Sequence, residues 1–271
     1  MFEDSAIVAA HPDDEVLWFS SVLAEVDQVI LCYIGADAQP AWSSGRRKSI
    51  TDYPLPNVSA LDLRESGAFL AVDWRNVTET EYGLAITEGG LSDARYRENY
   101  ERLLDKLGNS LTGMKNVFTH NPWGEYGHVE HVQVYRAVRT LQSKLGFNLW
   151  FSTYFSKETM SLMDRSRVLL EGDKITLSTN KTLARRIADL YKANNCWTWY
   201  DDYEWCDAET FVLQPTAALD ARRLGAVCPL NFISVQMPAG PRPPPGFFET
   251  MLRRLKKVGH AIGLRSSGHD G

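Results

Sequence analysis

Apolar and polar residues alternate along this chain in blocks that predict strands and helices. Residues 6–10 (AIVAA) and 28–34 (QVILCYI) are short apolar runs flanked by polar residues, as expected of buried strands. The segment at 35–60 is rich in Gly, Pro and Ser, and we expect it to be a long loop that is functional or mobile. Between the two strands, apolar residues at helical spacing predict a helix with a stripe of Val16, Leu17, Phe19, Leu23 and Val26.

The alternation continues further along the chain. More strands are expected at 73–77, 116–119 and 149–154. More helices are expected at 61–71, 93–107, 128–141 and 181–192. Strands that alternate with helices favour a mostly parallel sheet with both faces covered. The predicted fold class is therefore α/β: a three-layer α/β/α, Rossmann-like domain with a mostly parallel sheet and a C-terminal extension.

The pattern divides the chain into three parts. Residues 1–155 carry the clearest alternation and are expected to form a Rossmann-like core. Residues 156–237 either continue this domain or add a cap to it. Residues 238–271 begin with PAGPRPPPG and end in a basic amphipathic segment, so we expect a Pro-rich linker and a tail helix. Such a helix can make peripheral contact with an anionic membrane, although packing on its own domain is the commoner role.

Composition narrows the class of protein. The chain has 271 residues, of which 44% are hydrophobic, and this is enough apolar surface for a substantial core. A net charge of −5 argues against a nucleic-acid partner. The four cysteines form no CxxC pair, which argues for a reducing compartment and against a thiolate zinc site. The N-terminus lacks a basic, then apolar, leader pattern, and no apolar run approaches membrane-spanning length, so we expect a cytoplasmic protein.

Charged side chains follow two of the expected strands. His11, Asp13 and Asp14 come directly after the first strand, and His128 and His131 follow the strand at 116–119. Neighbouring carboxylates repel one another and are costly to bury, so a bound cation is the simplest explanation. The carboxyl ends of parallel strands meet at one edge of a sheet. Two imidazoles and one carboxylate with an open position suit a catalytic zinc ion, although Fe(II) or Co(II) can bind similarly.

Two motifs carry a resemblance to a known family. The segments AHPDDE (10–15) and GEYGHVEH (124–131) resemble those of the LmbE-like, or PIG-L-type, zinc-dependent de-N-acetylases. The resemblance spans about residues 5–154 and is looser beyond. Members of this family deacetylate glycolipids that contain N-acetylglucosamine, precursors of mycothiol and bacillithiol, and aminosugar antibiotics. The resemblance therefore implies a metal-dependent hydrolase of linear amides.

The resemblance also implies roles for individual residues. His11, Asp14 and His131 match the metal ligands of the family. Asp13 matches the general base that takes a proton from the metal-bound water. His128 matches a second histidine that acts as a general acid or steadies the oxyanion.

Two further matches concern the substrate. Tyr126 matches a loop tyrosine that polarises the amide carbonyl, and Arg64 lies where the family often carries a substrate-binding arginine. Val129 and Glu130 differ from the residues that are common at these positions, but both lie between the functional ones. Without the resemblance, Tyr126 is equally explained as a packed loop aromatic, and Arg64 as a solvated or ion-paired residue.

The predicted function is metal-dependent hydrolysis of the N-acetyl group of an aminosugar in a glycoconjugate, polysaccharide precursor or natural product. One alternative is a metal-dependent amidohydrolase of a non-sugar N-acyl amine, such as a peptide-like or polyamine substrate. Another is a nucleotide- or ligand-binding Rossmann-like protein without catalysis, but no glycine-rich phosphate loop follows the first strand. The expected partner is a small molecule or glycoconjugate, and the oligomeric state stays open. The aromatic, acidic stretch at 197–205 is expected to shape the substrate pocket.

Overall fold

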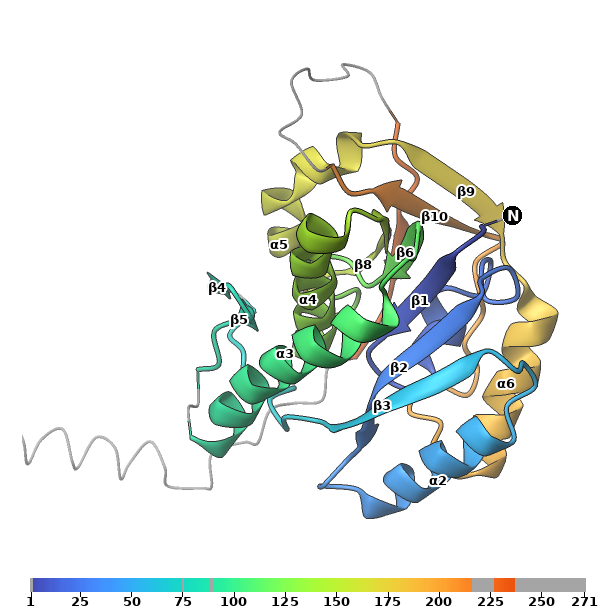
Figure 1. Cartoon of the computed structure of the whole chain (residues 1–271). Helices are drawn as coiled ribbons and strands as arrows, with labels where there is room; N and C mark the ends of the chain where they lie inside the picture. The colour runs from blue at the N-terminus through green and yellow to red at the C-terminus, as the bar shows by residue number, and fades with distance from the viewer. Residues whose placement is uncertain (1, 75, 88–89, 216–226, 237–271) are drawn as a thin grey trace, which may run out of the picture. The chain divides into compact units, whose positions relative to one another are not determined.

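A seven-stranded sheet lies at the centre of the computed structural model (Figure 1). Its strand order is β3-β2-β1-β6-β7-β10-β9. The first five strands in this order run parallel, whereas β10 is antiparallel to both of its neighbours. The strands are β1 (Ser5–Ala9), β2 (Gln28–Gly35), β3 (Val58–Arg64), β6 (Asn116–Thr119), β7 (Asn148–Ser152), β9 (Lys174–Ser178) and β10 (Ala208–Leu213).

Helices cover both faces of this sheet, and strand β1 shows why. Its side chains alternate, so that Ala6 and Val8 join one apolar cluster while Ile7 and Ala9 join the other. The first cluster packs under α3 (Leu91–Ser110), α4 (Val129–Leu145) and α5 (Met160–Arg165). The second packs under α1 (Asp14–Trp18), α2 (Pro40–Thr51) and α6 (Lys181–Ala193). The predicted three-layer α/β fold with a mostly parallel sheet is therefore confirmed.

The structure describes residues 2–74, 76–87, 90–215 and 227–236. Minor elements complete these parts: β4 (Glu79–Thr80), β5 (Gly83–Leu84), β8 (Tyr154–Ser156), β11 (Asn231–Ile233) and the 3₁₀ helix η1 (Arg167–Glu171). Beyond residue 155, β9 and β10 belong to the main sheet, and α6 packs on α1 and α2. No described helix has both the length and the apolar character needed to cross a bilayer. The expected linker and basic tail at 238–271, with their membrane contact, lie outside the described residues.

The sequence predictions for residues 35–60 and 61–71, near the β3 edge of the sheet, are wrong. The segment at 61–71 was expected to be helical, but residues up to Arg64 belong to β3, and the chain then turns at Gly67 with φ of +74°. An edge strand exposes alternate polar residues, here Asp62 and Arg64, and so lacks the continuous apolar run of a buried strand. The expected loop at 35–60 contains α2, which begins with a proline in its first turn. Its buried residues are Gly45, Arg46 and Ser49, which form no apolar stripe.

Two further predictions fail in their details. Helix α1 ends at Trp18 rather than near Val26, because Val22 N–H donates to Phe19 O at 3.0 Å in a tighter turn. The apolar stripe that suggested a longer helix is nevertheless buried. The strand expected at 73–77 is absent from the described residues of that segment, which are irregular. The strand expected at 149–154 is divided between β7 and β8.

The absence of a side chain at Gly45 lets α2 pack closely against Asn194 and Cys196, just after the end of α6. A Cβ atom at this position would overlap Asn194 O and would lie 3.0 Å from Cys196 Cβ. We expect Gly45→Ala to lower the free energy of unfolding by roughly 1–3 kcal/mol, because the overlapping atom belongs to backbone. In Gly108→Ala, the new Cβ meets only Leu141 Cδ2 at 3.7 Å, so this helical control should be neutral or stabilising. Urea unfolding of both variants tests the prediction, and equal stabilities would contradict it.

Candidate active site

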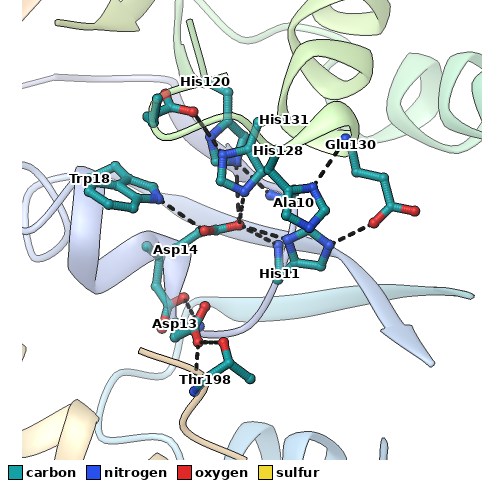
Figure 2. A network of polar contacts seen from close by, with 12 residues as sticks. Ala10, His11, Asp13, Asp14, Trp18, His120, His128, Glu130, His131 and Thr198 are labelled. Atoms are coloured by element: carbon teal, nitrogen blue, oxygen red, sulfur yellow. Dashed lines mark hydrogen bonds and ion pairs between the residues drawn. The ribbon is translucent and has the colours of Figure 1, made fainter. Parts of the chain in front are cut away.

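The carboxylate of Asp14 gathers groups from both sequence motifs at the carboxyl edge of the sheet (Figure 2). Its Oδ2 accepts a hydrogen bond from His11 N at 2.7 Å and lies 3.1 Å from His11 Nδ1. The same oxygen lies 3.2 Å from His131 Nε2. Its Oδ1 accepts from Trp18 Nε1 at 2.9 Å. The two motifs, which are separated by more than a hundred residues, therefore meet at one buried oxygen atom.

Two buried glutamates hold the histidines from behind. Glu130 Oε2 lies 2.8 Å from His11 Nε2, while its Oε1 accepts from Ser66 N at 2.5 Å. Glu125 Oε2 lies 2.8 Å from His131 Nδ1. A carboxylate on one ring nitrogen fixes the proton there and leaves the opposite nitrogen as a lone-pair donor. In both rings that opposite nitrogen faces Asp14.

His120, which directly follows β6, supports this arrangement. Its Nε2 accepts from Ala10 N at 2.8 Å, and its Nδ1 lies 3.0 Å from Glu125 Oε2. Its ring stacks on that of His131 with centroids 3.9 Å apart. Because both of its ring nitrogens already have protein partners, His120 positions Glu125 and the histidine beside it.

The buried carboxylates of this cluster stabilise positive charge on the histidines beside them. Burial lowers the pKa of His11, but the hydrogen bonds with Asp14 and Glu130 outweigh it and raise that pKa to about 10. Burial likewise lowers the pKa of His131, yet Asp14 and Glu125 raise it to about 9. Protons on these rings, or a cation between them, can supply the charge that the buried carboxylates need.

Within the described residues, two overlapping groups of side chains offer atoms close enough to hold a metal ion. One group is His11, His128 and His131, and the other is Asp14, His120 and His131; within each, the atoms lie within 4.8 Å of one another. His131 belongs to both groups, and its buried Nε2 lies 3.2 Å from Asp14 Oδ2. A buried imidazole nitrogen that faces a carboxylate oxygen at this distance fits shared ligation of one ion, so the residues present suit a divalent ion with nitrogen and oxygen ligands.

His128 caps the N-terminus of α4 and faces the same cluster. Its Nδ1 accepts from Glu130 N at 3.2 Å, so the neutral ring carries its proton on Nε2. The ring lies between those of Phe69 and His131, with centroids at 4.7 and 4.8 Å. Burial and the neighbouring charges of His11 and His131 hold the pKa of His128 well below its usual value. This histidine is therefore a neutral donor beside charged ones.

Tyr126 comes from the loop between β6 and α4. Gly124 and Gly127 adopt φ of +75° and +108° on either side of it, and at Gly124 a Cβ would meet His128 O at 2.7 Å. The Tyr126 ring lies 5.3 Å from that of His131 and 4.8 Å from that of Trp199. Burial and the charge of Asp14 raise the pKa of its hydroxyl, so the group stays protonated and can donate.

Asp13 is held in a strained conformation next to the cluster. Its φ of 107° lies in a region that residues with a side chain rarely adopt. Its Oδ2 accepts hydrogen bonds from the backbone N–H of Thr198 at 3.2 Å and from the Thr198 hydroxyl. Burial and the charge of Asp14 raise the pKa of Asp13 to about 7. A carboxylate in this range can take up a proton near neutral pH.

The two arginines near the site differ in burial. Arg64, chosen from the sequence, has a side chain that is 70% exposed and pairs with Asp37 at 3.1 Å, so its role in substrate binding stays a prediction. Arg46, which sequence reasoning missed, is buried and donates to Glu65 Oε1 at 2.5 Å. Burial lowers the pKa of Arg46, but Glu65 and Asp13 together raise it above its ordinary value. Arg46 therefore brings a positive charge close to Asp13.

Residues 6–142, which carry both motifs, match the model of PIG-L, described as GlcNAc-PI de-N-acetylase. The chain belongs to the PIG-L family. The resemblance seen in the motifs is thus confirmed, and membership supports an enzyme that acts on N-acetyl amides. A search of curated proteins finds no match to this chain.

Several solved structures of deacetylases are similar to this chain at low identity, and three of them follow. A teicoplanin-biosynthesis deacetylase in complex with teicoplanin has a TM-score of 0.49 and 12% identity, over 77% of this chain and 97% of that one. Teicoplanin deacetylase in its zinc-inhibited form gives 0.47 and 12%, over 77% and 97%. The A40926 pseudoaglycone deacetylase gives 0.45 and 14%, over 77% and 96%.

The carboxylates behind the histidines should tune metal affinity. We expect Glu125→Gln to weaken zinc binding roughly 10- to 100-fold, because loss of its charge lowers the basicity of His131. The control is Glu209→Gln, since Glu209 is equally buried but accepts its hydrogen bonds from Ser20, Ser21 and Tyr154. Competition titrations with a chromogenic chelator measure both affinities. Equal loss in the two variants would contradict the assignment.

Proposed function

We propose that this chain is a metal-dependent deacetylase that hydrolyses the N-acetyl group of an aminosugar in a glycoconjugate, polysaccharide precursor or natural product. Family membership supports the reaction class. The observation that carries the proposal is the close approach of Asp14 to His11 Nδ1 and His131 Nε2, beside Asp13, whose backbone is strained and whose carboxylate can take up a proton.

The proposed metal ligands are His11, Asp14 and His131. Zinc suits two imidazoles and one carboxylate, and Fe(II) or Co(II) suits them as well. The hydrogen bonds described above argue for this set. Binding through His120 would break its bonds to Ala10 N and Glu125, and binding through His128 would use either Nδ1, which caps α4, or Nε2, whose N–H serves as the donor to the oxyanion.

The bound metal supplies Lewis acidity, which polarises an amide carbonyl and makes water more acidic. We assign to Asp13 the role of general base, which takes the proton of the attacking water. The two hydrogen bonds from Thr198 and the positive φ of Asp13 set the orientation of its carboxylate. The N–H at His128 Nε2 can donate a hydrogen bond that stabilises the developing oxyanion, and the proton that Asp13 has taken from the water can pass to the leaving amine. The Tyr126 hydroxyl is a second donor for the oxyanion.

The surroundings of the site favour a sugar as the carrier of the amide. The rings of Phe69, Tyr126 and Trp199 cluster around His128 and His131, with Tyr126 in contact with the other two. Aromatic faces bind the apolar faces of sugar rings, while polar atoms at their edge can bind the hydroxyls. A non-sugar N-acyl amine is the second candidate, because an aromatic wall also accepts other apolar groups.

The decisive experiment for the proposed function combines metal content with acetate release. Zinc-loaded wild type should hold one ion per chain and release acetate from N-acetylated aminosugars in preference to N-acetylated alkyl amines. Asp13→Asn should keep the ion and lose roughly 10²- to 10⁴-fold in kcat, since it removes the general base. Asp62→Asn, on exposed β3, is the control and should match wild type. Acetate release by Asp13→Asn at the wild-type rate would contradict the mechanism.

Thr198 should matter for the rate rather than for substrate affinity. Thr198→Val removes the hydroxyl donor to Asp13, and we expect kcat to fall roughly tenfold with little change in KM, since a hydrogen bond to a charged group contributes about 1.5–3 kcal/mol. Thr198→Ser keeps the hydroxyl and should restore the rate. Steady-state kinetics on the preferred substrate measure both parameters, and a valine variant as fast as the serine variant would refute this role.

A further inference from the structure

The segment at 197–205, here called the aromatic segment, contacts the candidate active site and also lines a separate cavity. Thr198 contacts Asp13, and the Trp199 ring lies 4.8 Å from that of Tyr126, so these two residues face the candidate active site. The rings of the flanking Tyr200 and Tyr203 lie 5.2 and 6.0 Å from that of Trp199. They line a cavity of about 230 Å³ against helix α6, formed by Trp197, Tyr200, Tyr203, Trp205, Arg185 and Asp189 among others.

Internal contacts fix the walls of this cavity. Lys192 Nζ lies 3.2 Å from Asp201 Oδ1 and 5.6 Å from the centre of the Trp197 ring. Trp197 Nε1 donates to Tyr200 O at 3.4 Å. The rings of Tyr203 and Trp205 pack edge to face at 5.1 Å. The aromatic faces are thus held in place before any ligand arrives, which lowers the entropic cost of binding.

Two charged groups of the lining remain open to a ligand. Arg185 and Asp189 lie one turn apart on α6, and both are exposed. Neither has a hydrogen bond or ion pair within the part of the chain that the structure describes. Arg185 offers several N–H donors and Asp189 offers carboxylate acceptors, side by side.

The aromatic and charged residues that line the cavity favour an uncharged ligand with an apolar face and polar edges. Arg185 and Lys192 balance Asp189 and Asp201, so the cavity has no net charge with which to favour an anion or a cation. Aromatic faces next to paired donors and acceptors suit a ring with an apolar face and a rim of hydroxyl groups. The cavity is smaller than the roughly 300–1,000 Å³ of sites for drug-sized ligands, so it suits a single ring.

We propose that this cavity is a carbohydrate subsite that binds one uncharged pyranose ring of the glycoconjugate, separate from the ring that carries the reacting N-acetyl group. The ring packs its apolar face on the aromatic segment and exchanges hydrogen bonds with Arg185 and Asp189. The proposal rests on the proposed function for the identity of the ligand as part of the substrate, whereas binding itself can be tested without catalysis.

The test compares variants of neighbouring arginines on α6. The probe is N,N′-diacetylchitobiose, and saturation-transfer NMR titrations measure its dissociation constant with the full-length, metal-free protein, so that no turnover occurs. Arg185→Gln and Asp189→Asn remove the two open groups of the cavity. Arg186→Gln changes an exposed neighbour that does not line the cavity and serves as the matched control. None of these residues belongs to the proposed catalytic machinery.

We expect the affinity for the probe to fall at least fivefold in Arg185→Gln and Asp189→Asn and to stay at the wild-type value in Arg186→Gln. With the zinc-loaded protein, KM for the disaccharide should rise in the same two variants, while KM for N-acetylglucosamine and both kcat values stay unchanged. Equal affinities in all four proteins, or no binding of the probe, would overturn the subsite. Absence of acetate release from wild type would refute the proposed function instead, and the NMR titration would still decide the subsite.

Discussion

The candidate site depends on one buried carboxylate, that of Asp14. A carboxylate removed from water is stable only if positive charge and hydrogen-bond donors surround it. Asp14 has two such donors in His11 N and Trp18 Nε1, and two imidazoles within 3.2 Å. These contacts, with the charge of His131, hold its pKa well below the usual range despite burial. A divalent ion can supply this positive charge and leave both imidazoles neutral, as ligation requires.

The fold explains why these groups meet. Strands β1 and β6 pair in parallel, so the chain leaves both at the same edge of the sheet. The loop after β1 brings His11, Asp13 and Asp14, and the loop after β6 brings Glu125 and the start of α4. The tight path of the second loop needs positive φ at two glycines, and the first loop places Asp13 in a strained conformation. The strained backbone of Asp13 is tolerated because packing against the sheet and the hydrogen bonds from Thr198 hold the residue in this conformation.

Much of this arrangement could be predicted from the sequence. Continuous apolar runs located β1, β2 and β6, and clear helical periodicity located α3, α4 and α6. Helix α2 and strand β3 were missed, because Gly45 and Ser49 are buried by close backbone approach and β3 is a half-exposed edge. Those elements form through contacts with the rest of the sheet, which local patterns do not record.

The site was predictable to the extent that its residues lie within motifs. The two motifs identified His11 and His131, whose ring nitrogens lie against Asp14, but not Trp18 or His120. Glu125 lies within the second motif but was passed over, and its bond to His131 depends on the turn at Gly124. Arg46 lies in the segment expected to be a loop, and Thr198 reaches Asp13 from 185 residues away, so only the folded chain shows their proximity. Long-range convergence of this kind leaves no trace in spacing or periodicity.

The central claim is that Asp14 and its histidines hold a metal ion, and anomalous diffraction at the zinc absorption edge tests it most directly. Crystals grown with one equivalent of zinc should show a single anomalous peak within ligand distance of His11, Asp14 and His131, with His120 still bonded to Ala10 N. A peak ligated by His120 in place of His11 would contradict the proposed ligand set. The absence of any peak at Asp14 under full zinc loading would contradict the metal mechanism itself.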